Sequence, residues 1–295
     1  MSVFVMKLIA MASMLCDHAA VFLYPFHFIS HPAYVYMRAV GRVAFPIFAF
    51  LIVNGYEKTR DVKRYLTRLI AFAAISQIPY VLTGDVNRNP TGSGLAVALG
   101  EHWAVCLVLI VLACVVWFST VRMDGSVLWP LLALSMAVLR VSYCGVRILS
   151  DHLNVFYTLA LGLASVALTD RVLRPERDWV RLLAQGLALL GVFYLAGEHM
   201  DYRTLGAALI FSIWLARENR FSQAGVILLW CVVEYIIPKF PITHFLMAAL
   251  SLVPILLYKG EKGPPLKLAF YAIYPAHLAI LGALTVCYTL GALPQ

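Results

Sequence analysis

The chain has 295 residues, of which 62% are hydrophobic and only 13% charged, and its mean hydropathy is +0.84. Soluble domains carry about 25% charged residues, so this composition excludes an ordinary soluble protein. The net charge of +8 does not indicate nucleic-acid binding, which would require a clustered basic face interleaved with aromatic residues.

Apolar segments long enough to cross a bilayer, which takes about 20 residues, recur along the whole chain. They predict an all-α polytopic transmembrane helix bundle that forms a single integral membrane domain over residues 1–295, because lipid offers no partner to unpaired backbone groups. Two segments are short, so ten and eleven spans fit the sequence equally well. The expected spans are 4–24, 36–56, 65–82, 103–119, 127–147, 154–169, 180–196, 203–216, 221–237, 242–258 and 267–289.

The first span is expected to be retained rather than cleaved as a signal peptide, because Asp17 and His18 interrupt the region where cleavage would fall. The segment after the second span, "NGYEKTRDVKRYLTR", is the densest basic cluster in the chain, and the positive-inside rule places it in the cytoplasm. The N-terminus is then cytoplasmic, and the protein is expected to lie in the inner membrane. The cations of this cluster are Lys58, Arg60, Lys63, Arg64 and Arg68.

In this topology nearly all of the eight histidines fall toward the outer side, and His277 lies nearer the middle of the membrane. Histidine changes its charge near neutral pH, so this distribution favours proton transfer. His27 and His31 are best explained as residues tolerated in an outer loop, whereas the apolar surroundings of His18 and His277 favour a function. The six cysteines lie within spans without a C-x-x-C pair, which predicts neither a disulfide framework nor a metal site.

Ionisable residues within spans are costly, at ~2.5–3.5 kcal/mol each near a helix centre. Asp17 and His18 are neighbours and so point about 100° apart on a helix, which predicts that each contacts a different neighbouring helix. Arg38 and Arg42 share one face and require a carboxylate, a cluster of carbonyls or an anionic ligand. Pro46 is expected to kink the second span beside Arg42.

Two later spans carry similar polar stripes. Asn154 and Thr158 share a face of their segment, and Tyr274 and His277 are three residues apart on either side of Pro275. Such stripes on otherwise apolar helices are expected to point inward to a common cavity.

The chain resembles the TraX family in several blocks that occur in order. They are "MKLIAMASMLCDHAAVFLYP", "GRVAFPIFAFLIVNGYEKTRDVKRYLTRLIAFAAISQIPY", "LNVFYTLALGL", "DYRTLGAALI" and "KLAFYAIYPAHLAIL", which cover about residues 6–80, 151–163, 201–210 and 267–281. The family is named for a membrane protein that acetylates the N-terminus of a conjugative pilin. It is thought akin to transmembrane acyltransferases that use acetyl-CoA at a membrane-embedded histidine. The region 83–150 contains no such block.

The resemblance implies a membrane acetyltransferase that moves an acetyl group from cytoplasmic acetyl-CoA to an amine or hydroxyl at the outer side. A pilin-like N-terminus and a cell-envelope glycan are both open as the acceptor. The family blocks place the site residues at Asp17, His18, Arg42, Asn154, Asp201, Tyr271 and His277.

His18 is expected to be the general base, oriented by Asp17 or another carboxylate. Arg42, Asn154 or the tyrosine hydroxyl would stabilise the oxyanion. His277 is the alternative as the base or as the carrier of the acetyl group, so direct transfer and an acyl-histidine intermediate both stay open. The CoA phosphates are expected near Arg42, Lys58, Arg60, Lys63 and Arg64, although positive-inside anchoring alone accounts for the basic segment.

Two other classes of function fit the same residues. A proton-coupled transporter would use buried Asp, His and Arg as a relay, and a structural assembly subunit would use them to hold helices together. A transporter needs a midplane site with two gates, whereas an acyltransferase needs one pocket reached from both a donor channel and the outer side.

Overall fold

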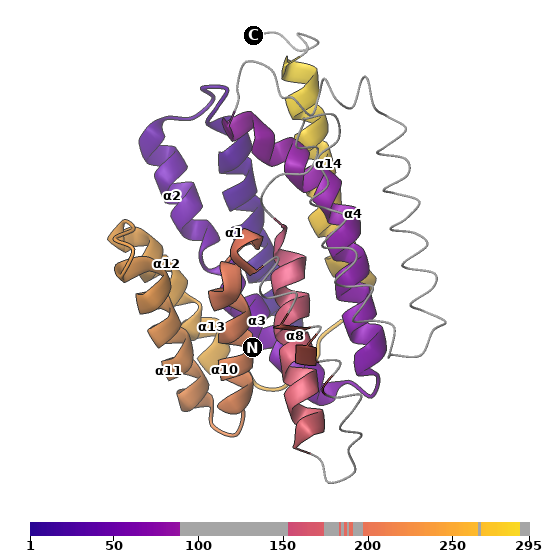
Figure 1. Cartoon of the computed structure of the whole chain (residues 1–295). Coiled ribbons are helices and arrows are strands. Elements are labelled where there is room, and N and C mark those ends of the chain that lie inside the picture. Colours follow the sequence, from indigo (N-terminus) through magenta and orange to yellow (C-terminus); the bar gives the residue numbers. More distant parts are fainter. Residues whose placement is uncertain are drawn as a thin grey trace.

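The computed structural model describes residues 1–88, 153–173, 183, 186–187, 189–190, 197–264 and 267–289. Within these ranges the chain is helical, with turns and one isolated bridge but no β-strand (Figure 1). The prediction of an all-α fold is therefore confirmed. The expected spans 103–119 and 127–147 lie outside the described residues, as does most of 180–196.

Three described segments are long and apolar enough to cross a membrane. They are α1 (Val3–Leu23), α2 (His31–Gly41) taken together with α3 (Ala44–Lys58), and α8 (Val155–Val172). The segment expected to be short at 154–169 thus continues to Val172 and reaches 18 residues. These helices support an integral membrane protein, while the total of ten or eleven spans stays a prediction.

Shorter or more polar helices complete the described bundle. α10 has 13 residues and is short, as the sequence indicated, whereas the expected span 242–258 is divided at Ser251. α4 and α14 pack side by side (Figure 1). The bounds are α4 (Val62–Arg88), η1 (Gly197–His199), α10 (Arg203–Leu215), α11 (Arg220–Cys231), the π-helical turn η2 (Val232–Ile236), α12 (Ile242–Leu250), α13 (Leu252–Leu256) and α14 (Lys267–Thr289).

α8 lies at the centre of the core. All residues from Leu153 to Ala164 are buried, as expected for a helix that is apolar on every side and packed by neighbours all round. Gly162 permits a close approach of α10, since a Cβ atom there would lie 2.5 Å from Cδ1 of Ile210. Small residues at such contacts let helix backbones approach closely.

The second expected span is broken beside Arg42, as expected, but Pro46 is not the cause. α2 ends at Gly41 and α3 begins at Ala44, so the break precedes the proline. Pro46 occupies the first turn of α3, where a backbone N–H would have no helical acceptor in any case. The expected kink at Pro46 is therefore wrong, and the break instead separates the arginine-bearing end of α2 from the apolar α3.

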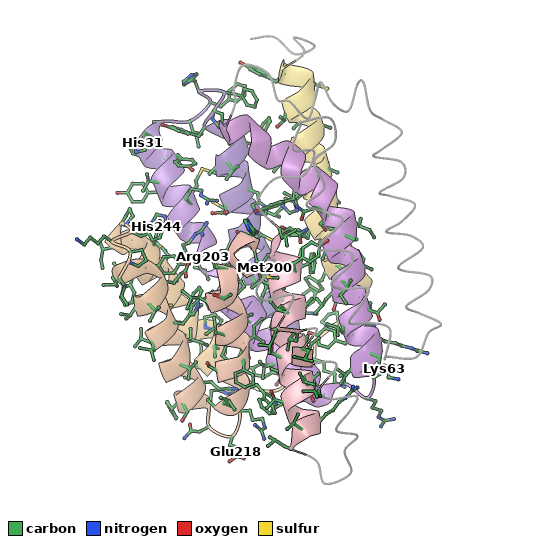
Figure 2. All side chains as sticks on the ribbon, viewed as in Figure 1. His31, Lys63, Met200, Arg203, Glu218 and His244 are labelled. Atoms are coloured by element: carbon green, nitrogen blue, oxygen red, sulfur yellow. The ribbon has the colours of Figure 1, made fainter. Side chains whose placement is uncertain are left out.

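The bundle has two ends, and helix termini also lie in its middle. Figure 2 shows Lys63 and Glu218 at one end and His31 at the opposite end. α8 and α10 both begin part-way along the bundle (Figure 1). There the backbone N–H of Leu153 donates to the His199 carbonyl at 2.6 Å, and the N–H of Asp201 donates to the Leu153 carbonyl at 2.9 Å. Non-helical backbone inside a membrane protein is tolerated where such bonds satisfy it and where it lines a cavity.

Candidate functional site

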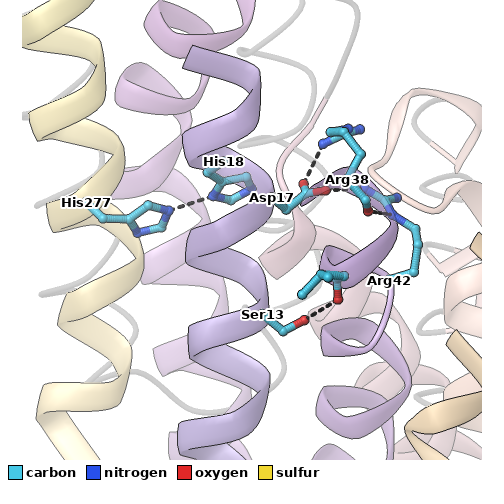
Figure 3. Close-up of polar contacts among 7 residues, drawn as sticks. Ser13, Asp17, His18, Arg38, Arg42 and His277 are labelled. Atoms are coloured by element: carbon cyan, nitrogen blue, oxygen red, sulfur yellow. Dashed lines mark hydrogen bonds and ion pairs between the residues drawn. The ribbon is translucent and has the colours of Figure 1, made fainter. Parts of the chain in front are cut away.

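Asp17 joins α1 to α2 through two arginines (Figure 3). Its Oδ2 lies 2.5 Å from Nη1 of Arg38, and its Oδ1 lies 2.6 Å from Nη2 of Arg42. Only 7% of Asp17 is exposed, and a buried carboxylate is tolerated only when it is paired. Of the three partners that the sequence left open for the arginines, the structure supplies a carboxylate, which Arg38 and Arg42 hold from one face.

The helices approach closely at this point. A Cβ atom on Gly41 would lie 2.4 Å from Cβ of Asp17, so no larger residue fits without a shift. One turn away on α1, the hydroxyl of Ser13 donates to the Val40 carbonyl at 2.7 Å. This contact fixes the carboxylate against the end of α2.

His18 joins the same turn of α1 to α14. Its Nδ1 lies 2.6 Å from Nε2 of His277, and the two ring planes differ by 9° (Figure 3). The ring of Tyr274 packs edge-on against both imidazoles, with centroid distances of 5.9 and 5.5 Å. Asp17 and His18 thus contact different helices, which confirms the inference from their angular separation.

The hydrogen bonds of the histidine pair determine which of the ring nitrogens carry protons. Nδ1 of His277 lies 2.8 Å from the Ile273 carbonyl, which can only accept, so this nitrogen carries a proton. In the neutral ring Nε2 of His277 is then the acceptor, and Nδ1 of His18 donates to it. A neutral His18 therefore keeps its lone pair on Nε2. His18 is therefore placed to act as a base, and His277 orients its ring.

A cavity of about 340 Å³ opens beside this pair. Asp17, its two arginine partners and His18 all line it. Its lining combines α1, α2 and α3 with α14 and the start of α10. His277 is not among its lining residues, so His18 presents the histidine pair to the cavity. The polar lining residues are Asp17, His18, Arg38, Arg42, Tyr80, Asp201, Tyr202 and Tyr274.

The cavity wall at Asp201 and Tyr202 has strained backbone. Tyr202 and Arg203 have φ angles of 74° and 48°, in the left-handed region that costs residues other than glycine about 1–3 kcal/mol each. The Tyr202 ring stacks on Phe45 at 3.8 Å between centroids, and Nη2 of Arg203 lies 3.6 Å from Oε2 of Glu234. Such strain occurs where a site requires a particular geometry.

Asn154 is a buried capping residue that does not contact Asp17, Arg38 or Arg42. Neither Asn154 nor Thr158 lines the cavity beside His18, so the expectation that their stripe points into a common cavity is wrong. Its side-chain oxygen accepts from the Phe156 N–H at 3.1 Å and caps α8. Its amide nitrogen donates to the Ala73 carbonyl at 2.7 Å and to Oε1 of Gln77 at 2.8 Å. Both amide protons are used, so in this arrangement Asn154 has none to donate to an oxyanion.

A second cavity of about 450 Å³ adjoins the first. It extends to the end of the bundle where Lys7, Lys58, Arg68 and Lys262 lie, which we call the basic end. Tyr271 lines this cavity rather than the first, and its ring stacks on Phe72 at 5.2 Å and on Phe156 at 6.2 Å. The walls are largely apolar. The residues that line both cavities are Met14, Phe48, Val155 and Tyr274.

The basic residues expected to bind a cofactor are separated by the structure. Arg42 lines the first cavity and Lys58 the second. Arg60, Lys63 and Arg64 are exposed and line neither cavity, and Arg64 pairs with Asp61 at 3.1 Å. A basic run in the sequence cannot by itself reveal which of its cations faces inward.

Several lining residues were missed by reasoning from the sequence. Lys7, Met11 and Met14 precede His18 at steps of three or four residues and so share its face of α1, a spacing that was visible in the sequence. Tyr202 gave no such signal, because its position depends on the fold around α10. Among the described residues, no three His, Cys, Asp or Glu side chains converge as metal ligands.

Comparisons with known proteins place these residues in a family context. The family profile described as "TraX protein" matches residues 2–142 and 141–285, and so extends over the region 83–150. A "Probable fimbrial assembly protein FimC, serogroup H1" of Dichelobacter nodosus is 27% identical over 284 residues, which cover 95% of this chain and 94% of that protein. No solved structure matches the chain.

Proposed function

The chain belongs to the TraX family, and we propose that it is a membrane-embedded acyltransferase. In this proposal an acetyl group passes from acetyl-CoA in the cytoplasm to an amine or hydroxyl at the outer side. The observation that carries the proposal is the histidine pair, in which His277 orients His18 so that the Nε2 lone pair of His18 is available at a polar cavity.

The pair suits the proton transfers of acyl transfer. As the acceptor attacks the thioester carbonyl, Nε2 of His18 takes the proton that the acceptor loses. The carbon–sulfur bond then breaks, and the same nitrogen returns the proton to the departing sulfur. The imidazolium formed in between is stabilised by His277, which accepts the Nδ1 proton of His18 in a hydrogen bond without taking it. His277 is thus a positioning residue and His18 the catalytic residue.

The arginines supply positive charge at the cavity. Arg38 and Arg42 together carry one charge more than Asp17 neutralises, and all three face the cavity. The two guanidinium groups favour the oxyanion of the tetrahedral intermediate where it forms beside them, although an ionised Asp201 in the same cavity offsets their excess charge. Asp201 faces the same space and is suited to bind the ammonium or hydroxyl group of an acceptor.

The relative from Dichelobacter nodosus supports a role in fimbrial assembly. We propose the N-terminal amine of a pilin-like protein as the acceptor, and a cell-envelope glycan as the alternative. The basic end of the bundle, with Lys58, the connection 59–61 and the first two turns of α4, faces the cytoplasm in this proposal, and the inner membrane is the location. The donor and the acceptor then reach His18 from opposite sides.

The decisive experiment follows radiolabelled acetyl-CoA with protein in lipid nanodiscs and a pilin-like peptide or an envelope glycan. We expect CoA release with the wild type and none with His18→Ala. His27→Ala is the matched control, because His27 lies in the turn after α1 and lines neither cavity. CoA release that persists in His18→Ala would contradict the proposal. Folded protein that consumes no acetyl-CoA in nanodiscs but carries a proton-linked solute flux in proteoliposomes would instead identify a transporter.

A further inference from the structure

The second cavity runs from the basic end of the bundle to the wall of the first cavity, which His18 lines. It shares wall residues with the first cavity, among them Met14 of α1 and Tyr274 of α14. The two cavities therefore share a wall beside His18, where Met14 and Tyr274 lie.

One face of α1 follows this route from end to end. Lys7, Met11 and Met14 line the second cavity, and Met14 and His18 line the first. Lys7 and His18 are eleven residues apart on α1, which at 1.5 Å per residue is about 16 Å along the helix axis. An extended pantetheine arm spans a distance of that order.

Cations gather where the second cavity reaches the basic end. Lys58 is the last residue of α3, Arg68 lies in the second turn of α4, and Lys262 precedes α14. With Lys7 they make four basic lining residues, and no carboxylate is among the described residues that line this cavity. Such a mouth attracts phosphate groups.

Arg68 provides a second, independent observation that points to a ligand at these cations. Its Nε is buried and has no hydrogen-bond partner among the described residues. A buried guanidinium nitrogen without a partner is unfavourable unless a ligand or water occupies the space in front of it. Positive-inside anchoring explains exposed cations, but it does not explain an arginine nitrogen that is withdrawn from water.

The middle of the second cavity is apolar and suits a chain without charge. Its wall includes Leu51, Leu69 and Leu159. At the mouth, the segment before α14 is fixed to the start of α1 by a hydrogen bond of 2.9 Å from the Val3 N–H to the Glu261 carbonyl. The cavity thus has basic residues at one end, apolar walls along its length, and Met14 and Tyr274 beside His18 at the other end.

We propose that the second cavity is the donor site and holds CoA, with its phosphates at Lys7, Lys58, Arg68 and Lys262 and its pantetheine arm along α1. This inference rests on the proposed function, and it assigns the donor to residues other than the exposed Arg60, Lys63 and Arg64. The thioester at the end of the arm reaches His18 from inside the bundle, and the acceptor enters through the first cavity.

The test measures equilibrium binding of CoA, 3′-dephospho-CoA and pantetheine to protein in nanodiscs of neutral lipid. CoA should bind more tightly than pantetheine, and salt should weaken the difference. Arg68→Gln and Lys58→Gln should each weaken CoA binding about tenfold or more, since each removes a charged hydrogen-bond donor to a phosphate group. Arg60→Gln is the matched control and should bind CoA as the wild type does.

A second pair of variants tests the apolar part of the cavity. Met11→Trp places a large ring in the route and should abolish CoA binding, whereas Leu8→Trp puts the same ring on an exposed face of the same helix and should not. Matching melting temperatures of these two variants would show that both are folded. Equal CoA affinity in Met11→Trp and the wild type would overturn the proposal.

The outcomes separate this inference from the proposed reaction. His18→Ala should bind CoA normally, so binding that depends on Arg68 without any acetyl transfer would retain the donor site and reject the reaction. Turnover in the wild type with no effect of Arg68→Gln, Lys58→Gln or Met11→Trp on CoA affinity would retain the reaction and reject the site. A phospholipid that copurifies with the wild type but not with Met11→Trp, together with no CoA binding, would assign the cavity to lipid.

Discussion

Nδ1 of His18 lies 2.6 Å from Nε2 of His277, so that two residues 259 positions apart in the chain share one proton between α1 and α14. The next residue, Asp17, is held by α2 instead. One turn of α1 therefore carries both a proton-transfer pair and an ion-pair cluster, and a change in either alters the position of the other.

We expect His277→Ala to lower the rate of acetyl transfer about 10- to 100-fold, less than the loss of a general base, which typically costs 10²–10⁴-fold. His277→Gln should recover part of the rate, because its amide oxygen can accept the Nδ1 proton of His18. The pH profile should shift in His277→Ala and not in a variant that is only less stable. If an acetylated enzyme forms, peptide mass spectrometry should find the label on His18. A label on His277 would reverse the two roles.

Asp17→Asn should be strongly destabilising, because it leaves two partly buried guanidinium groups without a carboxylate. Breaking one side of a buried ion pair costs about 3–5 kcal/mol. Arg38→Gln should cost less, since Asp17 would keep its bond to Arg42. The melting temperature in detergent measures both effects. A melting temperature of Asp17→Asn equal to that of the wild type would contradict the ion-pair arrangement.

Gly41→Ala should separate α1 from α2, because the added Cβ would lie 2.4 Å from Asp17. Overpacking of this kind typically costs about 1–3 kcal/mol. Gly225→Ala is the control, because a Cβ there meets nothing within 4 Å, and in α11 it should stabilise the helix by about 0.5–1 kcal/mol. The melting temperature should therefore fall in Gly41→Ala and rise in Gly225→Ala.

Asn154→Ala should reduce stability rather than change the chemistry. Loss of an N-cap costs about 0.5–2 kcal/mol, and the bonds to Ala73 and Gln77 are lost as well. The variant that remains folded should keep the pH profile of the wild type and a near-normal KM. A large fall in kcat with an unchanged melting temperature would instead return Asn154 to the catalytic group.

The orientation of the bundle can be read by cysteine labelling in a background without the six native cysteines. His27→Cys should react with a membrane-impermeant maleimide on intact spheroplasts. Arg60→Cys should react only after permeabilisation, because the positive-inside rule places its loop in the cytoplasm. The reverse pattern would place the mouth of the second cavity on the outer side, away from cytoplasmic CoA.

The sequence by itself determined the all-helical class, the inward polar stripes and the separation of Asp17 from His18. These follow from local properties: the hydropathy of each segment and the 3.6-residue period of a helix. Only the tertiary structure decided that His18 meets His277, that Asn154 caps α8, and that Lys58 rather than Arg60 faces a cavity. It also moved the break in the second span from Pro46 to the end of α2. Such pairings depend on which helix faces pack together and how closely, and the periodicity of one helix contains no information on its partner.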